Sequence, residues 1–402
     1  MQVTKAHKIL LYTTPELEAT FVSWCGAARW AYNMGLERKI TIHREGEKTP
    51  SLYTLMHEVV TLKKTDNNYA WLKDIPDSVP RLSLWHLELA YANFYRRVKG
   101  GATQKGFPCF KSKKKSKMAF HLENGTSIVN GNSVRIPKLG WIRMHQAIRF
   151  SGTLVGPVCI SLRAGKWYAS FSVKVEMPDP IENQEKVSSV GLDVGIKHLA
   201  ILSDGKKFDN PRAFYHLEKL LRRAQRQMVH KHKDSHRKQD ARLRVQRIHK
   251  RISDVRSNAT HQASAYIANN YGRVALEDLN TAGMVRNRRM AKAILDANFC
   301  EMHRQLVYKM AWAGGEVRRV DRFFPSSKLC SACGCINNNL TLDDREWDCK
   351  CGAHHDRDVN AAINLATKCF GRGLTVTARE GTGVVRPTYE ARTTPNNLVG
   401  IR

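Results

Sequence analysis

Three acidic residues in the second half of the chain stand where regular structure is expected to begin or end. Asp193 lies in the largely apolar run VGLDVGIKHLAIL, Glu277 lies in VALEDLN, and Asp358 opens DVNAAINLATKCF. Hydrolysis of a phosphodiester by two divalent cations about 4 Å apart needs oxygen ligands from several directions. Carboxylates on separate elements that converge at strand ends would supply such ligands.

Two of these acids also have simpler interpretations. Asp193 could be a turn residue beside Gly191 and Gly195, although an acid in an apolar strand is costly to bury unless it is paired or bound to a metal. Glu277 has a neighbouring rival in Asp278, and an acid at a strand end could simply face solvent.

The third acid cannot be chosen by spacing alone. Asp356 and Asp358 both lie in HHDRDVNAA, where a carboxylate could accept hydrogen bonds from the free amides of a helix terminus. The residues leave both open as the third ligand.

A cysteine cluster predicts a second, different metal site. Cys330 and Cys333 form a CxxC pair, and Cys349 and Cys351 form a CxC pair after fifteen intervening residues. This spacing is typical of a four-cysteine zinc ribbon. We expect a structural Zn²⁺, because four protein ligands leave no open position for water.

The second cysteine pair is shorter than the usual CxxC. Cys335, His354 or His355 could therefore replace one of the four ligands. Buried free thiols are the alternative to zinc.

The charge of the chain predicts a polyanionic partner. Lys and Arg number 66 against 36 Asp and Glu, a formal net charge of +30. Nucleic acid is favoured over a membrane surface, because the chain has no run of about 18 uncharged apolar residues and no concentrated amphipathic basic helix. The start of the chain lacks the apolar core and the cleavage site of a secretory signal, so a cytoplasmic location is expected.

Three segments concentrate the positive charge. Residues 214–256 hold fourteen Lys or Arg against four Asp or Glu and favour two basic helices in a hairpin, while 110–117 and 285–292 read FKSKKKSK and VRNRRMAK. A solvated helical face is the alternative for some of these charges, but their excess over acids favours contacts with phosphates. The candidate contacts are Lys113, Lys114, Lys115, Arg222, Arg223, Arg286, Arg288 and Arg289.

The remaining patterns predict the elements that position these residues. A strand over 5–13 precedes helices that begin after Thr14-Pro15 and continue to about residue 99. Short antiparallel strands with turns at Asn130-Gly131 and Ala164-Gly165 follow between about 119 and 178, forming a small barrel or sheet that the N-terminal strand could join. A linker is expected at 178–186.

The order of these motifs resembles the TnpB family, transposon-encoded relatives of type V CRISPR effectors. The resemblance spans nearly the whole chain and rests on the following segments: AYANFYRRVKG with KGFPCFKSKKK, IPKLGWIRM, GLDVGIKHLAILSDG, ALEDLN, FFPSSKLCSACG and HDRDVNAAINL. The shortened CxC pair is the main departure, and it places one zinc ligand in doubt.

The resemblance implies an α+β multidomain architecture. An oligonucleotide-binding-like β-barrel wedge domain with a helical recognition insertion precedes an RNase H-like (RuvC) α/β nuclease domain with a zinc-ribbon insertion. The implied bounds are 1–13 and 119–180 for the wedge domain, 14–118 for the recognition domain, 187–329 and 355–370 for the nuclease domain, 330–354 for the zinc-binding insertion, and 371–402 for a flexible tail.

The resemblance also implies the activity. A monomer would bind a guide RNA transcribed from the transposon end and cut double-stranded DNA beside a short flanking motif, with Asp193, Glu277 and Asp358 holding two Mg²⁺ ions. Tyr53 matches a position that a relative uses to contact the flanking motif, with a core tyrosine as the equal alternative. A guided DNA-binding regulator would have lost an acid, and a strand-joining transposase would use the same acids for transesterification; both remain alternatives.

Overall fold

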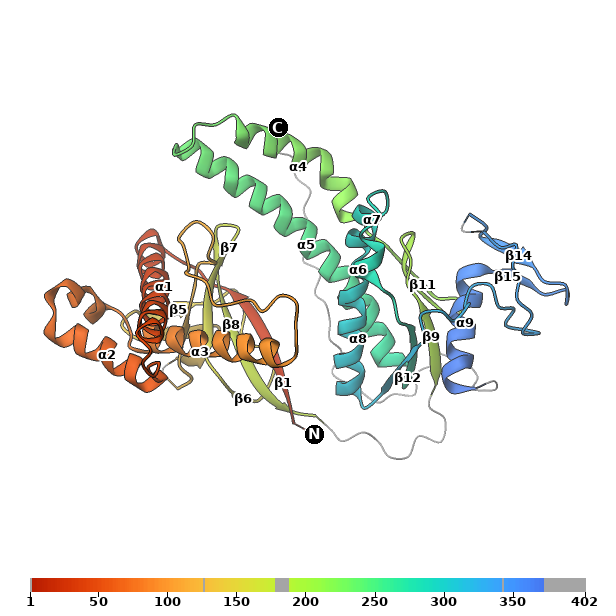
Figure 1. Ribbon diagram of the computed structural model, residues 1–402. Helices are drawn as coiled ribbons and strands as arrows, with labels where there is room; N and C mark the ends of the chain where they lie inside the picture. The colour runs from red at the N-terminus through yellow and green to blue at the C-terminus, as the bar shows by residue number, and fades with distance from the viewer. Residues whose placement is uncertain (1, 126, 178–187, 342, 372–402) are drawn as a thin grey trace. The chain divides into compact units, whose positions relative to one another are not determined.

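A computed structural model describes residues 2–125, 127–177, 188–341 and 343–371 of the chain (Figure 1). The chain consists of two compact units, Met1–Met177 and Pro178–Arg402. The expected linker, and the expected tail beyond Gly371, lie outside the described residues. Within the described residues, no helix is both long enough and apolar enough to cross a membrane.

The first unit combines antiparallel strands with inserted helices. Its elements are β1 (Gln2–Leu10), α1 (Pro15–Arg44), α2 (Leu52–Thr65), a 3₁₀ helix (Asn67–Asp74), α3 (Ser78–Lys99), β2 (Ala119–Leu122), β3 (Ile128–Asn130), β4 (Ser133–Ile136), β5 (Gly140–Arg143), β6 (Thr153–Leu154), β7 (Val158–Arg163) and β8 (Lys166–Glu176). One sheet has the order β1-β8-β7-β2, with β6 also on β8, and β3-β4-β5 form a second sheet.

The N-terminal strand joins the middle sheet, as the sequence suggested. β1 pairs antiparallel with β8 from Gln2 to Leu10. The strand begins and ends about three residues earlier than the expected 5–13, because the pairing with the long strand β8 extends to its first described residues. The helices between β1 and β2 are therefore an insertion in chain order.

Of the local signals in this unit, the cap at Thr14 and the turn at Ala164-Gly165 are confirmed, whereas the turn expected at Asn130-Gly131 lies one residue later, between β3 and β4. Ala164 and Gly165 both have positive φ, 52° and 77°, which is the type I′ geometry that matches the twist of a two-residue hairpin between β7 and β8. Thr14 caps α1 by accepting a hydrogen bond from the amide of Leu17, and Pro15 is the first helical residue.

The inserted helices cover the sheet through aromatic side chains. Phe21 and Trp24 of α1 are almost fully buried. The ring centroid of Phe21 lies 5.0 Å from that of Trp167, and the centroid of Trp24 lies 5.3 Å from that of Phe120. The helices and the sheet of this unit therefore share one core.

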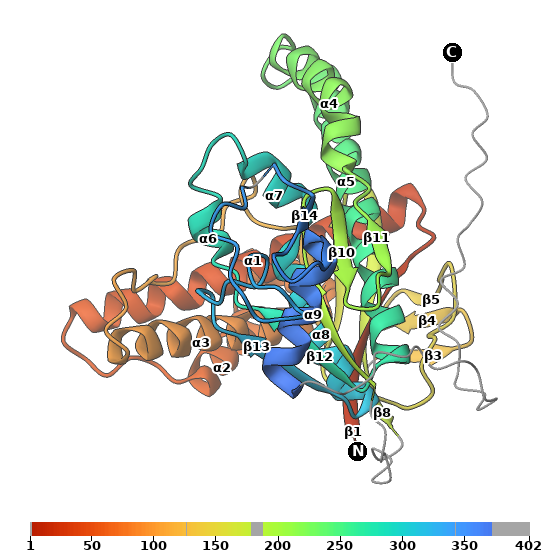
Figure 2. The same cartoon turned by 90° about the vertical axis from the view of Figure 1, so that its right-hand side faces the viewer.

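The second unit is built on a mixed five-stranded sheet (Figures 1 and 2). Its elements are β9 (Ser189–Asp193), β10 (His198–Leu202), β11 (Lys207–Asp209), α4 (Ala213–Val229), α5 (His236–Asn270), β12 (Arg273–Glu277), α6 (Thr281–Met284), α7 (Ala291–Ala297), α8 (Phe299–Ala313), β13 (Glu316–Val320), β14 (Glu346–Asp348), β15 (His354–Asp356) and α9 (Arg357–Phe370). The strand order is β11-β10-β9-β12-β13, with β9, β12 and β13 parallel and β10 antiparallel to both of its neighbours.

Helices cover both faces of this sheet. Residues of α5 and α8 form one apolar core with Val190, Leu192, Val274 and Leu276 of the two central strands. The opposite face packs on α9, where Ala275 belongs to a second core. Coverage on both faces explains why β9 and β12 read as continuous apolar runs rather than as alternating patterns.

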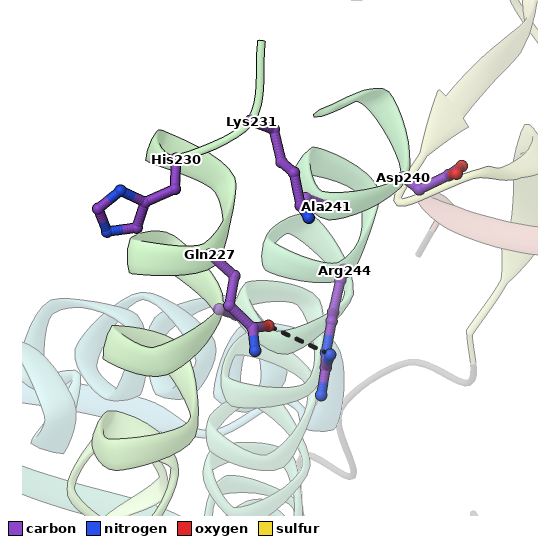
Figure 3. A pocket seen from close by; sticks show the side chains of 7 residues that line it. Gln227, His230, Lys231, Asp240, Ala241 and Arg244 are labelled. Carbon is purple, nitrogen blue, oxygen red and sulfur yellow. Dashed lines mark hydrogen bonds between the residues drawn. The ribbon is translucent and has the colours of Figure 1, made fainter. Parts of the chain in front are cut away.

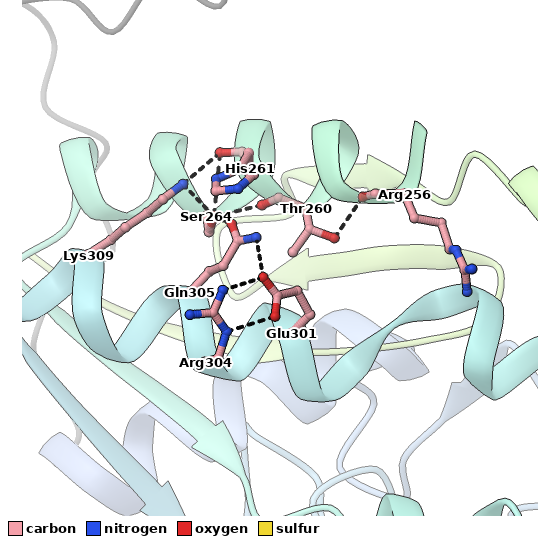
Figure 4. A network of polar contacts seen from close by, with 8 residues as sticks. All are labelled: Arg256, Thr260, His261, Ser264, Glu301, Arg304, Gln305 and Lys309. Atoms are coloured by element: carbon pink, nitrogen blue, oxygen red, sulfur yellow. Dashed lines mark hydrogen bonds and ion pairs between the residues drawn. The ribbon is translucent and has the colours of Figure 1, made fainter. Parts of the chain in front are cut away.

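A polar network joins α5 to α8 beside their apolar contact (Figure 4). The hydroxyl of Ser264 donates to Oε1 of Gln305 at 2.8 Å, and Nε2 of Gln305 donates to Glu301 at 2.9 Å. Nζ of Lys309 donates to Ser264 at 2.8 Å and to the carbonyl of His261 at 2.9 Å. Burial lowers the pKa of Lys309 to about 8, and the negative charge of Glu301 opposes this shift.

The expected pair of basic helices is present as the hairpin of α4 and α5, which extends beyond the sheet (Figure 2). The first turn of α4 has no capping side chain of its own, because Arg212 at its N-cap carries only hydrogen-bond donors and cannot accept an amide. The buried carboxylate of Asp296 accepts the amide of Phe214 at 3.0 Å instead. A residue of α7 thus anchors the base of the hairpin.

Candidate functional site

The alternation of side chains along two neighbouring strands brings Asp193 and Glu277 to the same face of the sheet. Leu192 of β9 lies opposite Leu276 of β12 in a parallel register, so the next residues, Asp193 and Glu277, are neighbours at the carboxyl ends. The leucines face α5 and α8. Because side chains alternate between faces, both acids point to the face that α9 covers.

Gly191 allows α9 to approach this face closely. A Cβ atom at position 191 would lie only 1.7 Å from the carbonyl oxygen of Ala362. From this contact, two residues of strand lead to Asp193 and four residues of helix lead back to Asp358, both paths about 6 Å long. The absent side chain of Gly191 therefore helps to bring the N-terminus of α9 beside Asp193.

Electrostatics shows that the three carboxylates lie within range of one another. Burial, followed by repulsion from Asp358 and Glu277, raises the pKa of Asp193 to about 8. Burial also raises the pKa of Glu277. Because burial and two neighbouring carboxylates suppress the ionisation of Asp193, bound cations would be stabilising beside it.

The structure separates each candidate acid from its neighbouring rival. Asp278 pairs with Arg322 at 3.0 Å, away from the acid cluster. Asp356 is the N-cap of α9, accepting the amides of Asp358 at 3.0 Å and Val359 at 3.2 Å. Asp358 does not cap the helix, which leaves its carboxylate available to the cluster.

Cationic side chains border the cluster at the start of α9. Nη1 of Arg345 lies 3.5 Å from Oδ2 of Asp358. Arg357 donates to the carbonyl of Asp344 at 3.1 Å, and its charge opposes the rise in the pKa of Asp193. These contacts hold the segment before β14 against the N-terminus of α9.

The predicted cysteine cluster is assembled. The Sγ atoms of Cys330, Cys333, Cys349 and Cys351 all lie within 4.8 Å of one another. Two of the separations are 3.8 Å, Cys330 to Cys351, and 3.5 Å, Cys333 to Cys349. Tetrahedral zinc with bonds of about 2.3 Å requires sulfur atoms about 3.8 Å apart, so this donor set fits Zn²⁺. Among the described residues, these four cysteines are the one group of three or more His, Cys, Asp or Glu side chains that could hold a metal ion, and Asp193, Glu277 and Asp358 are not part of it.

Cys335, His354 and His355, which the sequence offered as substitutes for a zinc ligand, do not belong to the group of four clustered sulfurs. Cys335 and His354 are outside the four-sulfur group, and His354 contacts Asp348 at 2.8 Å. His355 is buried, with Nε2 3.0 Å from Sγ of Cys330. The contact makes His355 a neighbour of a ligand sulfur.

Two asparagines that the motif search did not select tie the cysteine cluster to α9. Asn360 accepts the amide of Ser331 at 3.0 Å and donates to the carbonyl of Leu329 at 2.7 Å. Asn364 donates to the carbonyls of Ser326 and Leu329. Both are buried, and the available signal was two asparagines at i, i+4 spacing in an otherwise apolar helix.

The candidate nucleic-acid contacts are all exposed, and they belong to several elements of the two units. Lys113, Lys114 and Lys115 lie in the loop between α3 and β2, Arg222 and Arg223 lie on α4, and Arg286, Arg288 and Arg289 lie between α6 and α7. Arg222 is also paired with Glu218 at 2.6 Å. Tyr53, on α2, has 82% of its surface exposed, which excludes the core alternative.

A cavity of about 480 Å³ opens between α4 and α5 (Figure 3). Its lining includes His230, Lys231, Asp240 and Arg244, and Gln227 bonds to Arg244 across it at 3.4 Å. This cavity belongs to the basic hairpin and not to the acid cluster. This cavity is therefore not the candidate catalytic site.

Family models match three parts of the chain. The model described as "Probable transposase" matches residues 172–288, "Cas12f1-like, TNB domain" matches residues 299–365, and "Helix-turn-helix domain" matches residues 1–48. Residues 2–48 form β1 and the single long helix α1, so the last description does not correspond to the structure of this segment.

Curated relatives match nearly the whole chain. A protein of Streptomyces pristinaespiralis named "Putative RNA-guided DNA endonuclease" is 34% identical over 405 residues, covering 99% of this chain and 96% of the relative. "Putative RNA-guided DNA endonuclease InsQ" of Escherichia coli (strain K12) is 32% identical over 382 residues, covering 91% and 92%. One chain of a solved Cas12f1-sgRNA-target DNA complex aligns with 90% of this chain over 99% of its own length, at 18% identity and with a TM-score of 0.34.

Proposed function

Because the chain belongs to the TnpB family of transposon-encoded RNA-guided DNA endonucleases, we propose that it cuts double-stranded DNA directed by a guide RNA from the transposon end. The observation that carries this proposal is that the charges of Glu277 and Asp358 act on Asp193. Three acids this close to one another support a cutting enzyme over a regulator that only binds DNA. Pairing with the guide would read the target sequence, while the protein reads a short flanking motif.

We assign the domains of the chain according to the architecture that the family resemblance implies. Residues 1–13 and 119–180 would form the wedge domain, 14–118 the recognition insertion, and 187–329 with 355–370 the RuvC nuclease domain. The mixed five-stranded sheet with helices on both faces supports the last assignment. Residues 330–354 would form the structural zinc insertion, supported by the four clustered sulfurs.

The three acids would hold two Mg²⁺ ions, for which carboxylate oxygens are the preferred ligands. Bound there, the ions would lower the pKa of an attacking water and stabilise the leaving oxygen of the phosphodiester. Asp193, Glu277 and Asp358 would fix the positions of the ions from three elements, and Arg345 would hold the Asp358 carboxylate in place until metal binds. The products would carry 5′-phosphate and 3′-hydroxyl ends.

Copurification with transposon-end RNA, followed by incubation with Mg²⁺ and a plasmid library of random flanks, tests the proposal. Guide-dependent linearisation beside one short motif is the expected result, and sequencing the cut ends identifies that motif. Tight guided binding without cuts would support the regulator instead, and joined strands in the products would support a transposase.

The active-site assignment has its own test in Asp193→Ala. We expect this variant to lose cleavage and to retain guide binding, because Asp193 lies at the centre of the acid cluster. Full cleavage by the variant would remove Asp193 from the mechanism while leaving guided recognition intact.

A further inference from the structure

A stretch of the first unit has a composition that neither the acid cluster nor the zinc centre explains. Between Glu88 and Glu123 the chain has no Asp or Glu, and it has nine Lys or Arg. The same stretch, which covers the end of α3 and the loop before β2, contains five aromatic residues between positions 91 and 110. Basic residues interleaved with aromatic rings suit a strand of nucleotides, because phosphates and bases alternate in the same way.

Three of these rings are exposed to solvent. Tyr95 on α3 is 56% exposed, and Phe107 and Phe110 in the following loop are 48% and 57% exposed. We call these three residues the aromatic platform. Large aromatic side chains left this accessible on a soluble protein indicate a surface that a partner covers.

The aromatic platform rests on a fixed base. Phe107 packs edge-on against Tyr91 and Phe94, with ring centroids 5.7 Å and 5.3 Å apart. Tyr91 in turn stacks with Tyr95 at 6.2 Å. Rings held by other rings keep their orientation before a ligand arrives, which lowers the entropic cost of binding.

The loop that carries Phe110 is anchored on α1. The amide of Lys111 donates to Oδ1 of Asn33 at 2.8 Å, and Nδ2 of Asn33 donates to the carbonyl of Lys111 at 2.9 Å. The ammonium of Lys111 lies 3.6 Å from the centre of the Tyr32 ring. Phe110 is therefore positioned by the two hydrogen bonds between the Asn33 side chain and the backbone of the adjacent Lys111.

Cations border the aromatic platform closely. Gly106 has φ of +64°, and a Cβ there would lie 2.4 Å from a guanidinium nitrogen of Arg97. Arg97 thus lies directly over the loop beside Phe107. Arg96, Lys113, Lys114 and Lys115 are exposed around the same segment.

We propose that the aromatic platform stacks unpaired bases of the guide RNA, with the surrounding Lys and Arg holding the adjacent phosphates; this inference rests on the proposed function. The positive charge excludes a second copy of the chain, because two such surfaces would repel each other. Guide RNA is favoured over target DNA because a permanently bound partner must cover the rings, and loops of RNA present splayed bases that stack on aromatic side chains.

Binding of guide RNA to the full-length protein, measured without Mg²⁺, is the first test. Tyr95→Leu removes the ring but keeps an apolar side chain, and it should weaken RNA binding roughly 5-fold or more, as expected for loss of one stacked base. Tyr95→Phe should bind like the natural protein, because stacking does not need the hydroxyl. Equal affinity of Tyr95→Leu and the natural protein would overturn the proposal.

A matched control separates stacking from general loss of an aromatic residue. Trp71, in the 3₁₀ helix of the same unit, is 39% exposed and lies between Asp66 and Asp74 in the sequence. We expect Trp71→Ala to leave RNA affinity unchanged. A loss equal to that of Tyr95→Leu would mean that the effect is structural and would overturn the assignment.

Photo-crosslinking identifies which nucleic acid touches the platform. Guide RNA carrying 4-thiouridine at unpaired positions should crosslink to Tyr95, Phe107 or Phe110, and mass spectrometry would locate the adduct. Crosslinks found only with 4-thiothymidine in the target DNA would overturn the choice of RNA. Failure of the natural protein to cut any guided plasmid, with RNA crosslinks at the platform, would overturn the endonuclease proposal alone.

Discussion

The position of Asp193 would suit the proposed binding of a metal ion, but it is electrostatically unfavourable for the carboxylate while no metal is bound. Its pKa of about 8, raised by burial and by Asp358 and Glu277, means that folding keeps a proton on a group that is ionised in the unfolded chain. The free-energy cost is absent below the unfolded pKa of about 4, grows as the pH rises, and is complete above the folded pKa.

Asp193→Asn should therefore stabilise the protein when Mg²⁺ is absent. The gain should be small at pH 4 and should reach at least about 1.4 kcal/mol near pH 8, the equivalent of one pKa unit. Thermal unfolding in a magnesium-free buffer that retains zinc measures it. A variant with the same unfolding temperature as the natural protein at pH 8 would show that Asp193 is not under electrostatic stress.

Replacing either Asp358 or Asp356 by asparagine tests which of the two is the metal ligand and which is only the helix cap. Asp358→Asn should lower cleavage roughly 100-fold or more, because charge stabilisation by a bound metal is worth several kcal/mol. Asp356→Asn should remain close to natural activity, because asparagine caps a helix as well as aspartate does. Guided plasmid cleavage compares the two, and equal losses would contradict the assignment of Asp358.

Serine substitutions can distinguish the four proposed zinc ligands from the nearby Cys335. Cys351→Ser should lower bound zinc well below one ion per chain, whereas Cys335→Ser should leave one ion, because Cys335 lies outside the four-sulfur group. Elemental analysis of the purified variants gives the stoichiometry. Loss of zinc from Cys335→Ser alone would assign the fourth ligand to Cys335.

At the scale of elements, the contact between β9 and α9 positions the acid cluster. One strand supplies Asp193 and one helix supplies Asp358, and the two meet where Gly191 has no side chain. Asn360 and Asn364 then join the same helix to the segment that begins the cysteine cluster. The acid cluster and the cysteine cluster are therefore connected through α9.

Gly191→Ala should disrupt this contact. The new Cβ would meet backbone rather than a flexible side chain, so the cost should be at the upper end of the 1–3 kcal/mol that is typical of overpacking, about 3 kcal/mol. Cleavage should fall as α9 moves away from β9. Gly26→Ala in α1 is the control, because its Cβ would meet only Arg29 at 3.8 Å, and chemical unfolding of both variants tests the difference.

At the scale of the whole molecule, an excess of 30 positive charges is distributed over both units. The basic loop after α3 belongs to the first unit, and the α4–α5 hairpin and the segment between α6 and α7 belong to the second. Contacts with phosphate release condensed counterions, so affinity for nucleic acid should fall steeply with salt.

Replacing all three of Lys113, Lys114 and Lys115 by alanine should make guide-RNA binding less dependent on salt. The negative slope of log K against log salt concentration should become about 2 to 3 smaller in magnitude. Lys63→Ala is the control, because Lys63 is already paired with Asp77 at 2.7 Å and should leave the slope unchanged. An unchanged slope in the triple variant would show that this loop does not contact phosphate.

Local chemistry determined much of this protein from the sequence alone. The cap at Thr14, the hairpin turn at Ala164-Gly165 and the paired helices of the basic hairpin depend on neighbouring residues, and each is confirmed. The cysteine pairs are also local signals, because each pair lies within a short knuckle. The choice of Asp358 needed the family resemblance, since spacing alone did not separate it from Asp356.

Only the tertiary structure decided what each side chain faces. Asp278 turns to Arg322 and Asp356 caps α9, which distinguishes them from Glu277 and Asp358 beside them. The close approach at Gly191 also joins segments about 170 residues apart in the sequence. Such contacts depend on strand register and helix packing, which are set by many weak interactions between distant residues and leave no short pattern in the sequence.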